Sequence, residues 1–107
     1  MNENIIVFEL QAKLCQVLAH PIRLRIINIL KDGIKPVNEI VSIVDEAQST
    51  VSRHLGVLRS AGILETHRKG TEIFYEITSP KIVEVCDLMH SVLIEQETHR
   101  AELFNLI

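Results

Sequence analysis

The sequence predicts a mostly α-helical fold with one small β-hairpin, and three observations carry the prediction. Apolar residues recur at helical spacing through most of the 107-residue chain. The spacing changes to alternation only in residues 63–77, around a glycine-containing turn. Residues 45–47 form a short turn between two apolar-striped segments. Four helices, a hairpin and a last helix in this order are typical of a winged helix-turn-helix domain, and we expect residues 1–107 to form a single one.

A proline separates the first two helices. The first is predicted over residues 5–19, and it ends at His20 because the residue before a proline is pushed out of the helical conformation. Pro21 suits the first turn of the second helix, where the N–H that it lacks would have no partner. This helix is predicted to continue to about Lys31, and Gly33 follows its end.

Residues 36–61 are predicted to form the helix-turn-helix. A short helix runs to Val44, and a second helix leaves at a sharp angle from Gln48. In this second helix Val51 and the leucines at i+4 and i+7 form one apolar stripe, which predicts its buried face.

The residues off this stripe have side chains that suit nucleic acid. Amide and guanidinium groups bind the edges of adenine and guanine in pairs of hydrogen bonds, and hydroxyls contact phosphates. We therefore expect this segment to bind DNA through six residues: Gln48, Ser49, Thr50, Ser52, Arg53 and His54.

Residues 63–77 are predicted to form the wing, a two-stranded hairpin. Ile73, Tyr75 and Ile77 alternate with acidic residues, which predicts one buried face. The tip is basic and directly follows the helix-turn-helix, so we expect it to hold an adjacent DNA backbone or minor groove. The residues concerned are His67, Arg68 and Lys69.

A last helix begins after Ser79, a capping residue, with proline in its first turn. Segments 1–19 and 79–107 contain more apolar residues than a thin winged domain needs for its own core. Their surplus predicts dimerisation helices and hence a homodimer.

Charge is distributed unevenly along the chain. The formal net charge is −3, but residues 48–71 carry a local +3 and residues 79–107 a local −3. One face can therefore be basic on an acidic protein, which is compatible with DNA binding.

The composition of the chain further limits the classes of protein to which it can belong. Hydrophobic residues make up 47% of the chain, and no apolar run reaches the roughly 18 residues that span a bilayer. The start of the chain lacks the features of a signal peptide, so we expect a cytoplasmic protein without a membrane partner. The five histidines are scattered, and no glycine loop that could cradle phosphate is present, so we predict no catalytic residues and no enzyme activity.

Three separated motifs resemble the ArsR/SmtB-type repressors. They read VLAHPIRLRII at 17–27, QSTVSRHL at 48–55 with LRSAG at 58–62, and RKG at 68–70 with FY at 74–75. The resemblance implies a homodimeric repressor that binds a palindromic double-stranded DNA operator and releases it when an inducer binds. It also implies that the fourth helix enters the major groove and that the hairpin is the wing.

The metal sites of that family do not carry over to this sequence. One would fall near Pro36 and Asn38, and the other would begin near Ser79 and Lys81, which are not suitable ligands. We therefore expect neither known metal site and no resident cofactor.

Two cysteines leave three alternatives for what is sensed. Cys15 lies on the first helix and Cys86 on the last, so a disulfide or polysulfide between them could repack the dimer interface and release DNA. Alternatively, Cys86 and His90, at i and i+4, could bind zinc, copper(I) or trivalent arsenic together with Cys15 and Asp87. In the third alternative both thiols are only packed in the core.

Two further alternatives concern basic residues. Arg23 and Arg25 are predicted either to contact phosphate or to pair with acidic residues, and His20 is predicted to be structural. A rival from another functional class is a winged helix used as a protein-interaction module, with the basic strip binding an acidic partner.

Overall fold

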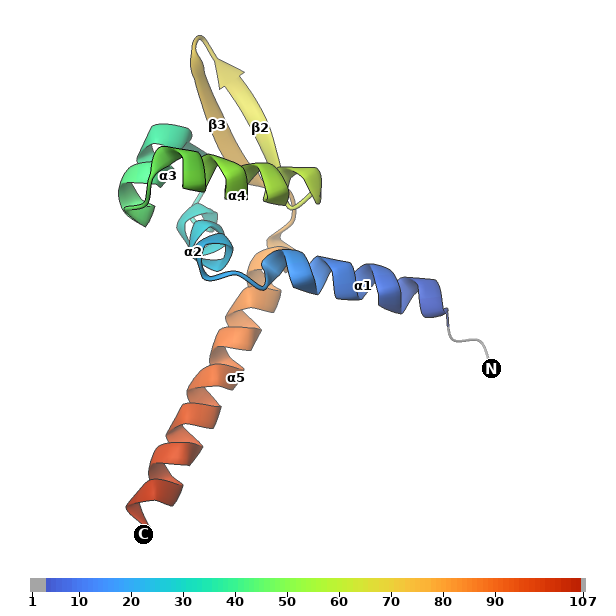
Figure 1. Cartoon of the computed structure of the whole chain (residues 1–107), viewed down its shortest axis with the longest axis vertical. Coiled ribbons are helices and arrows are strands. Elements are labelled where there is room, and N and C mark those ends of the chain that lie inside the picture. The colour runs from blue at the N-terminus through green and yellow to red at the C-terminus, as the bar shows by residue number, and fades with distance from the viewer. Residues whose placement is uncertain (1–3, 107) are drawn as a thin grey trace.

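The computed structural model describes residues 4–106 and confirms the predicted winged helix-turn-helix. Within these residues the chain forms five helices and three strands (Figure 1). The helices are α1 (Ile5–Leu18), α2 (Pro21–Leu30), α3 (Val37–Val44), α4 (Gln48–Ser60) and α5 (Pro80–Asn105). The strands are β1 (Lys35–Pro36), β2 (Leu64–Lys69) and β3 (Glu72–Ile77).

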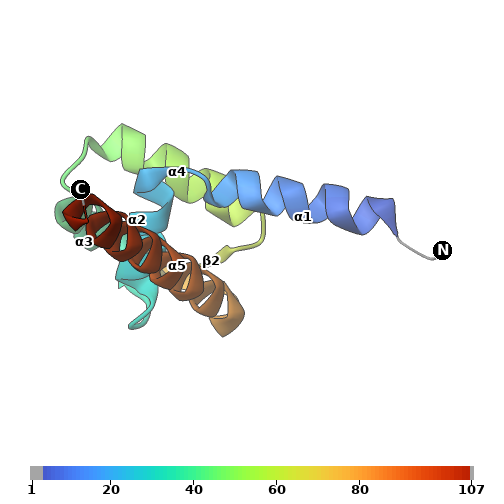
Figure 2. The same cartoon turned by 90° about the horizontal axis from the view of Figure 1, so that it is seen from below.

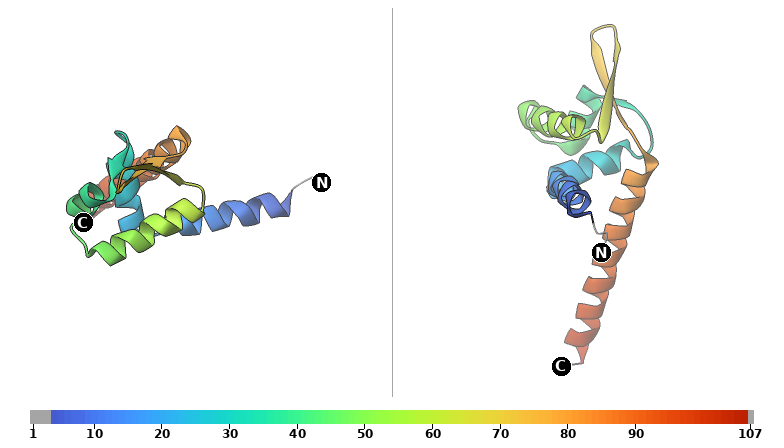
Figure 3. Two further views of the ribbon diagram at one scale, coloured as in Figure 1. Left: turned by 90° about the horizontal axis from the view of Figure 1, so that it is seen from above. Right: turned by 90° about the vertical axis from the view of Figure 1, so that its right-hand side faces the viewer.

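The elements divide into a packed body and two projecting helices. Helices α2, α3 and α4 pack together beneath the sheet, and the β2–β3 hairpin rises from the body at the end opposite to α5 (Figure 1). Helices α1 and α5 leave the body in different directions, and each is free of other elements along most of its length (Figures 2 and 3). The molecule is therefore extended, with principal dimensions of 59 × 44 × 22 Å.

The core lies where α2, α3 and α4 meet the start of the hairpin. Its fully buried side chains are aliphatic and come from each of these elements, including Ile26 of α2, Ile40 of α3 and Leu55 of α4. The hairpin adds Leu64 at its base. Helix α1 contributes only Leu18 to the fully buried core, and α5 contributes no fully buried residue, so α2, α3 and the base of the hairpin supply most of the core that positions α4. Val17 of α1 and Ile82 and Cys86 of α5 pack against this core as partly buried residues.

The sheet contains a strand that the sequence analysis missed. β1 pairs antiparallel with β3, with Lys35 opposite Tyr75, so the strand order is β1-β3-β2. A strand of two residues has no periodicity to detect, and its pairing partner is distant in sequence. It also shortens the predicted third helix by one residue, because Pro36 belongs to β1 and α3 starts at Val37.

Two tight turns set the directions of α4 and of the wing. Asp45 ends α3 in the left-handed conformation, at φ 56°, and its N–H donates to the Val41 carbonyl at 3.0 Å. A single left-handed residue after a helix reverses the chain sharply, so α4 can cross α3 after only two more residues. At the wing tip Gly70 has φ 62°, a conformation that glycine adopts without steric cost.

No single helix in residues 4–106 is long and apolar enough to cross a membrane. The bent pair formed by α1 and α2, with 87° between the two helices, passes the same test of length and composition.

Candidate nucleic-acid interface

Helix α4 has one polar exposed face and one fully buried face. Gln48, Ser49, Ser52 and Arg53 are exposed, and Thr50 is half-buried. Behind them the side chains that hold the helix are 0% exposed: Val51, Leu55 and Leu58. The polar face is thus backed by an aliphatic core that fixes where its donors and acceptors point.

The first turn of α4 also offers backbone donors. Its N-cap is Ala47, whose methyl side chain cannot accept a hydrogen bond from the N–H groups of the first turn. The first N–H groups of a helix have no intrahelical acceptor and favour an anion such as phosphate. These groups lie on the same end of the helix as Gln48 and Ser49.

His54 occupies a different environment from the rest of this face, and its predicted DNA contact is wrong. The residue is 2% exposed, and its Nδ1 accepts a hydrogen bond from Nε of Arg23 at 3.1 Å. Its ring stacks against that of His20, with centroids 4.2 Å apart. Helical periodicity placed His54 near the edge of the apolar stripe, and only the packing of α2 against α4 decided that it faces inward.

The surroundings of His54 favour the neutral imidazole. Burial lowers its pKa below the ordinary value of 6.5, and electrostatic interactions with His20, Arg23 and Arg53 lower it further. Since Nδ1 accepts from Arg23, the ring proton belongs on Nε2, which has no hydrogen-bond partner in the described structure.

Arg23 has a role that neither sequence alternative anticipated. Besides its bond to His54, it donates from Nη1 to the Val17 carbonyl in the last turn of α1, at 3.1 Å. One guanidinium therefore joins α1, α2 and α4. His20 is structural as predicted, because its Nδ1 accepts from the Ile22 N–H and caps α2.

The three basic residues at the wing tip have different surroundings. All are exposed, and Lys69 lies with Nζ 5.4 Å from the centroid of the Phe74 ring. His67 instead approaches two carboxylates, with Nε2 3.3 Å from Oε1 of Glu76 and 3.8 Å from Oε1 of Glu65. No sequence motif marks these two glutamates, although strand alternation puts Glu65 on the same face as His67.

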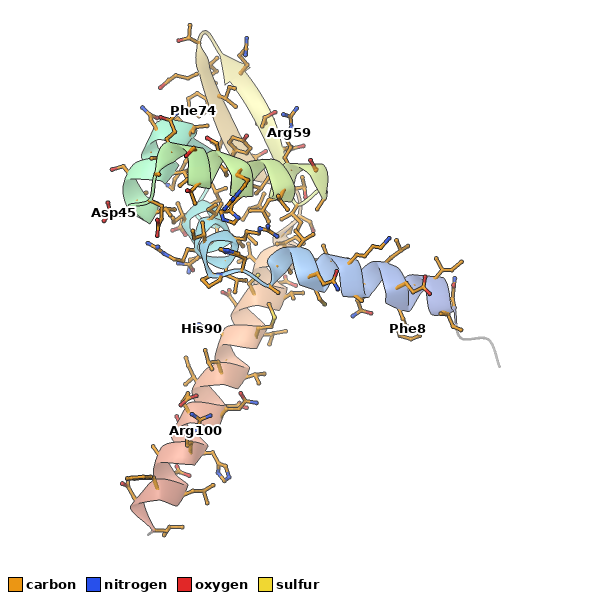
Figure 4. The ribbon with its side chains drawn as sticks, in the orientation of Figure 1. Phe8, Asp45, Arg59, Phe74, His90 and Arg100 are labelled. Atoms are coloured by element: carbon orange, nitrogen blue, oxygen red, sulfur yellow. The ribbon has the colours of Figure 1, made fainter. Side chains whose placement is uncertain are left out.

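A shallow groove lies between α4 and the wing. Its walls come from α3, from Gln48 and Ser52 of α4, and from Thr71 and Tyr75 in and beside β3. Arg59 of α4 also lies beside the hairpin, as the labelled side chains of Figure 4 show. Of the sequence-predicted residues, Gln48 and Ser52 line this groove, whereas His54 is buried.

The two cysteines lie in different environments, and both are free thiols. Cys15 is exposed on α1, whereas Cys86 of α5 is half-buried and packs against the core. Burial raises the pKa of the Cys86 thiol, and the negative charge of Asp87 raises it further. Cys86 is therefore protonated at neutral pH, which lowers its reactivity as a nucleophile.

A cavity of about 660 Å³ separates α5 from α2. Cys86, Asp87 and His90 line it from α5, opposite Arg25 and Asn28 of α2. Cys15 is not among the described residues that line this cavity. Three of the four alternative metal ligands thus line one cavity, but their ligand atoms do not all lie within 4.8 Å of one another, and the fourth ligand lies on α1.

The fold and the polar face of α4 together define a winged helix-turn-helix protein that regulates transcription. Residues 20–66 match the model of the bacterial regulatory proteins of the arsR family. The chain belongs to the ArsR family, which places it among transcription regulators rather than enzymes, as the sequence predicts.

Characterised and structurally solved relatives agree with this assignment. The chain is 36% identical over 86 residues to the biofilm growth-associated repressor of Xylella fastidiosa, covering 80% of this chain and 75% of that protein. The crystal structure of Rv0081 from M. tuberculosis superposes with a TM-score of 0.81 at 34% identity, covering 89% of this chain and 96% of the other. The homodimeric winged helix-turn-helix domain of Mb0332 from Mycobacterium bovis gives a TM-score of 0.79 at 27% identity, covering 89% and 88%.

Proposed function

We propose that this protein is a dimeric transcriptional repressor whose α4 enters the major groove of a palindromic operator. The observation that carries the proposal is the division of α4 into two faces. Exposed Gln48, Ser52 and Arg53 supply the groups that read base edges, and three fully buried aliphatic residues hold the helix rigidly behind them.

The neighbouring elements supply contacts to the DNA backbone. Ser49, Thr50 and the free N–H groups at the start of α4 suit phosphates, and Arg68 and Lys69 lie exposed on the wing. Such contacts fix the position of the protein on DNA without reading its sequence. Specificity for the base sequence therefore rests on Gln48, Ser52 and Arg53. The polar face of α4 and the wing tip therefore suit double-stranded DNA as a partner, and we expect this binding to take place in the cytoplasm.

Dimerisation is needed to read a palindrome, and the two projecting helices offer the surface for it. Each exposes large apolar side chains along its length, and Figure 4 shows Phe8 pointing from α1 away from the rest of the chain. The exposed set comprises Ile5, Ile6, Val7, Phe8, Leu10 and Leu14 of α1 and Val85, Leu88, Met89, Val92, Leu93, Ile94, Leu103 and Phe104 of α5. Apolar surface on this scale marks an interface, and the relative from M. bovis is a homodimer.

Selection of bound sequences from a random duplex library tests the proposal. We expect enrichment of a palindrome with half-sites about one helical turn, roughly 34 Å, apart. Binding of that duplex should weaken steeply with salt and should exceed binding of a scrambled duplex by about a thousandfold or more. Equal binding of both duplexes would instead favour the protein-interaction module with an acidic partner.

For the inducer we propose thiol chemistry at Cys15 and Cys86. Peroxide would oxidise one thiol to a sulfenic acid, and the second thiol would condense with it, releasing water and leaving a disulfide. A persulfide donor would pass its outer sulfur to one thiol and leave as a thiol, and peroxide, reduced to water, would then join the resulting persulfide to the second thiol as a trisulfide. Because Cys15 and Cys86 lie on the two helices proposed to form the interface, such a link would change the separation of the two α4 helices in the dimer.

One observation favours a second inducer, a metal or metalloid ion. Cys86, Asp87 and His90 line the same cavity between α2 and α5, and Cys15 would have to join them from α1. Release of operator by peroxide or a persulfide donor, lost in both Cys15→Ser and Cys86→Ser, supports thiol chemistry. Release by zinc or arsenite, lost in His90→Ala, supports the ion. Unchanged operator binding under all these agents would leave Cys86 as a packing residue and Cys15 without a sensing role.

A further inference from the structure

The outer face of the wing brings together one imidazole and two carboxylates. The register of β2 and β3 puts Glu65 directly opposite Glu76, and His67 follows on the same face of β2. One ligand atom from each of the three residues lies within 4.8 Å of the other two. The Nε2 atom of His67 faces both carboxylates, at 3.3 Å and 3.8 Å.

Glu65 and Glu76 form an unfavourable pair when nothing positive lies between them. Like charges directly opposite each other in an antiparallel ladder are destabilising. A cation bound by all three side chains would remove the repulsion, and the backbone ladder already holds the three residues at neighbouring positions.

The donor set indicates which cation fits. An imidazole nitrogen and two carboxylate oxygens suit a borderline divalent ion, and zinc binds such mixed sets at about 2.0–2.2 Å. Three protein ligands leave a fourth position open for water or for a phosphate oxygen. We propose that Glu65, His67 and Glu76 bind a divalent zinc ion, and that this ion strengthens the contact of the wing with DNA.

The effect on DNA follows from the charge of the wing. Residues 64–77 contain Arg68 and Lys69 against three glutamates, so their formal charge is −1 with neutral His67. One bound divalent ion changes this formal charge to +1, beside the surface that must approach phosphates. This second part of the inference rests on the proposed function, whereas zinc binding itself does not.

The wing site is separate from the cysteine-containing cavity. The hairpin and α5 extend from opposite ends of the body (Figure 1), and none of the three wing residues lines the cavity between α2 and α5. The two possible ion sites can therefore be told apart by mutation and by the location of the spectral response.

Zinc binding is tested on the full chain without DNA. The Cys15→Ser/Cys86→Ser double variant removes competing thiols, and zinc chloride is titrated by calorimetry while backbone amide shifts are followed by NMR. We expect one zinc ion per chain with shifts concentrated in residues 64–77, and a loss of affinity of about tenfold or more in His67→Gln. Glu72→Gln is the matched control, because it removes a wing carboxylate outside the ligand set.

Two results of this titration would overturn the inference. One is unchanged zinc affinity in His67→Gln, and the other is a set of shifts confined to α5. A second ligand variant, Glu76→Gln, distinguishes the loss of a zinc ligand from misfolding. It should weaken zinc binding yet raise the zinc-free affinity for DNA, because it removes one negative charge from the wing, and unfolding would not produce that gain.

The DNA part is tested with the selected duplex, with zinc chloride and with a chelator. In the double cysteine variant, zinc should raise operator affinity about fivefold or more, which is the lower end of the usual coupling between two binding sites. The same increase is expected when Glu72→Gln is added to this variant. It should be absent when His67→Gln is added. Operator binding that zinc does not change would overturn this part and leave the proposed function intact. Zinc binding at the wing of a protein that binds no duplex would overturn the proposed function instead.

Discussion

Arg23 donates from Nε to Nδ1 of His54 at 3.1 Å, and this bond ties α2 to the buried side of α4. The same guanidinium holds the Val17 carbonyl at the end of α1. The orientation of α4 is thereby connected to the helix that we propose forms the dimer interface. A buried bond of this kind has consequences for stability and for its pH dependence.

Arg23→Ala should destabilise the fold. It removes two hydrogen bonds from a charged donor and leaves Nδ1 of buried His54 without its partner, which costs about 1–3 kcal/mol. Urea denaturation followed by circular dichroism measures the change. Arg25→Ala, on the exposed side of the same helix, should stay within about 0.5 kcal/mol of wild type. Equal stability of the two variants would show that the Arg23 bonds contribute nothing.

Stability should fall when the pH is lowered below 6.5. The pKa of His54 is below 6.5 in the folded chain, so between these two values the unfolded chain binds the proton more readily. The contribution of His54 is complete above pH 6.5 and is lost as the pH falls through its folded pKa. Denaturation curves at pH 7.5, 6.5 and 5.5 should show a smaller loss for His54→Gln than for wild type. Parallel losses in the two proteins would refute this origin.

Arg53→Ala should weaken operator binding without affecting the fold. One bidentate contact to a base is worth about 1–3 kcal/mol, which corresponds to about 5- to 150-fold in affinity. Fluorescence anisotropy with the selected duplex measures it, and thermal unfolding should remain unchanged because the side chain is exposed. Arg100→Ala, far along α5 and paired with Glu97 at the surface, is the matched control. Equal affinity of both variants would remove Arg53 from the interface.

A charge on the exposed apolar face of α5 should disrupt the dimer. Leu88 is 67% exposed in the single chain, and Leu88→Glu would have to bury a carboxylate if this face is covered. Light scattering after size exclusion should give twice the chain mass of 12.2 kDa for wild type and the single mass for the variant. Ile34→Glu, at an exposed isoleucine outside both long helices, should remain dimeric. A dimeric Leu88→Glu variant would place the interface elsewhere.

The two thiols should differ in reactivity. Cys15 is exposed, whereas burial and Asp87 raise the pKa of Cys86, so less of Cys86 is thiolate at neutral pH. In single-cysteine variants, a colorimetric disulfide reagent should therefore react faster with Cys15 than with Cys86, and urea should reduce the difference. If Cys86 reacts first, Cys15 is not the initial site of oxidation.

Local patterns were sufficient for most of the fold. Proline at position 21, the three-residue turn after Val44 and the alternation in residues 63–77 each specify a backbone change within a few residues, so the element order follows from the sequence. β1 was not predicted, because nothing in its two residues indicates a strand except the pairing with β3, which lies about forty residues away in the sequence.

The residues of the candidate site also differ in how far local sequence patterns predict their environment. Gln48, Ser49, Ser52 and Arg53 are exposed as predicted, because a strong apolar stripe defines the opposite side of their helix. His54 lies next to that stripe, and its helical position allows either environment.

The sequence alone determined the winged helix-turn-helix and the outward residues of α4, because hydrophobic periodicity and turn residues act over short distances. Tertiary structure decided that His54 faces Arg23, that Glu65 and Glu76 surround His67, and that Cys86 rather than Cys15 lines a cavity. These relationships depend on which helices and strands pack together. Their energies come from contacts between residues that are distant in the chain, and no local pattern encodes those contacts.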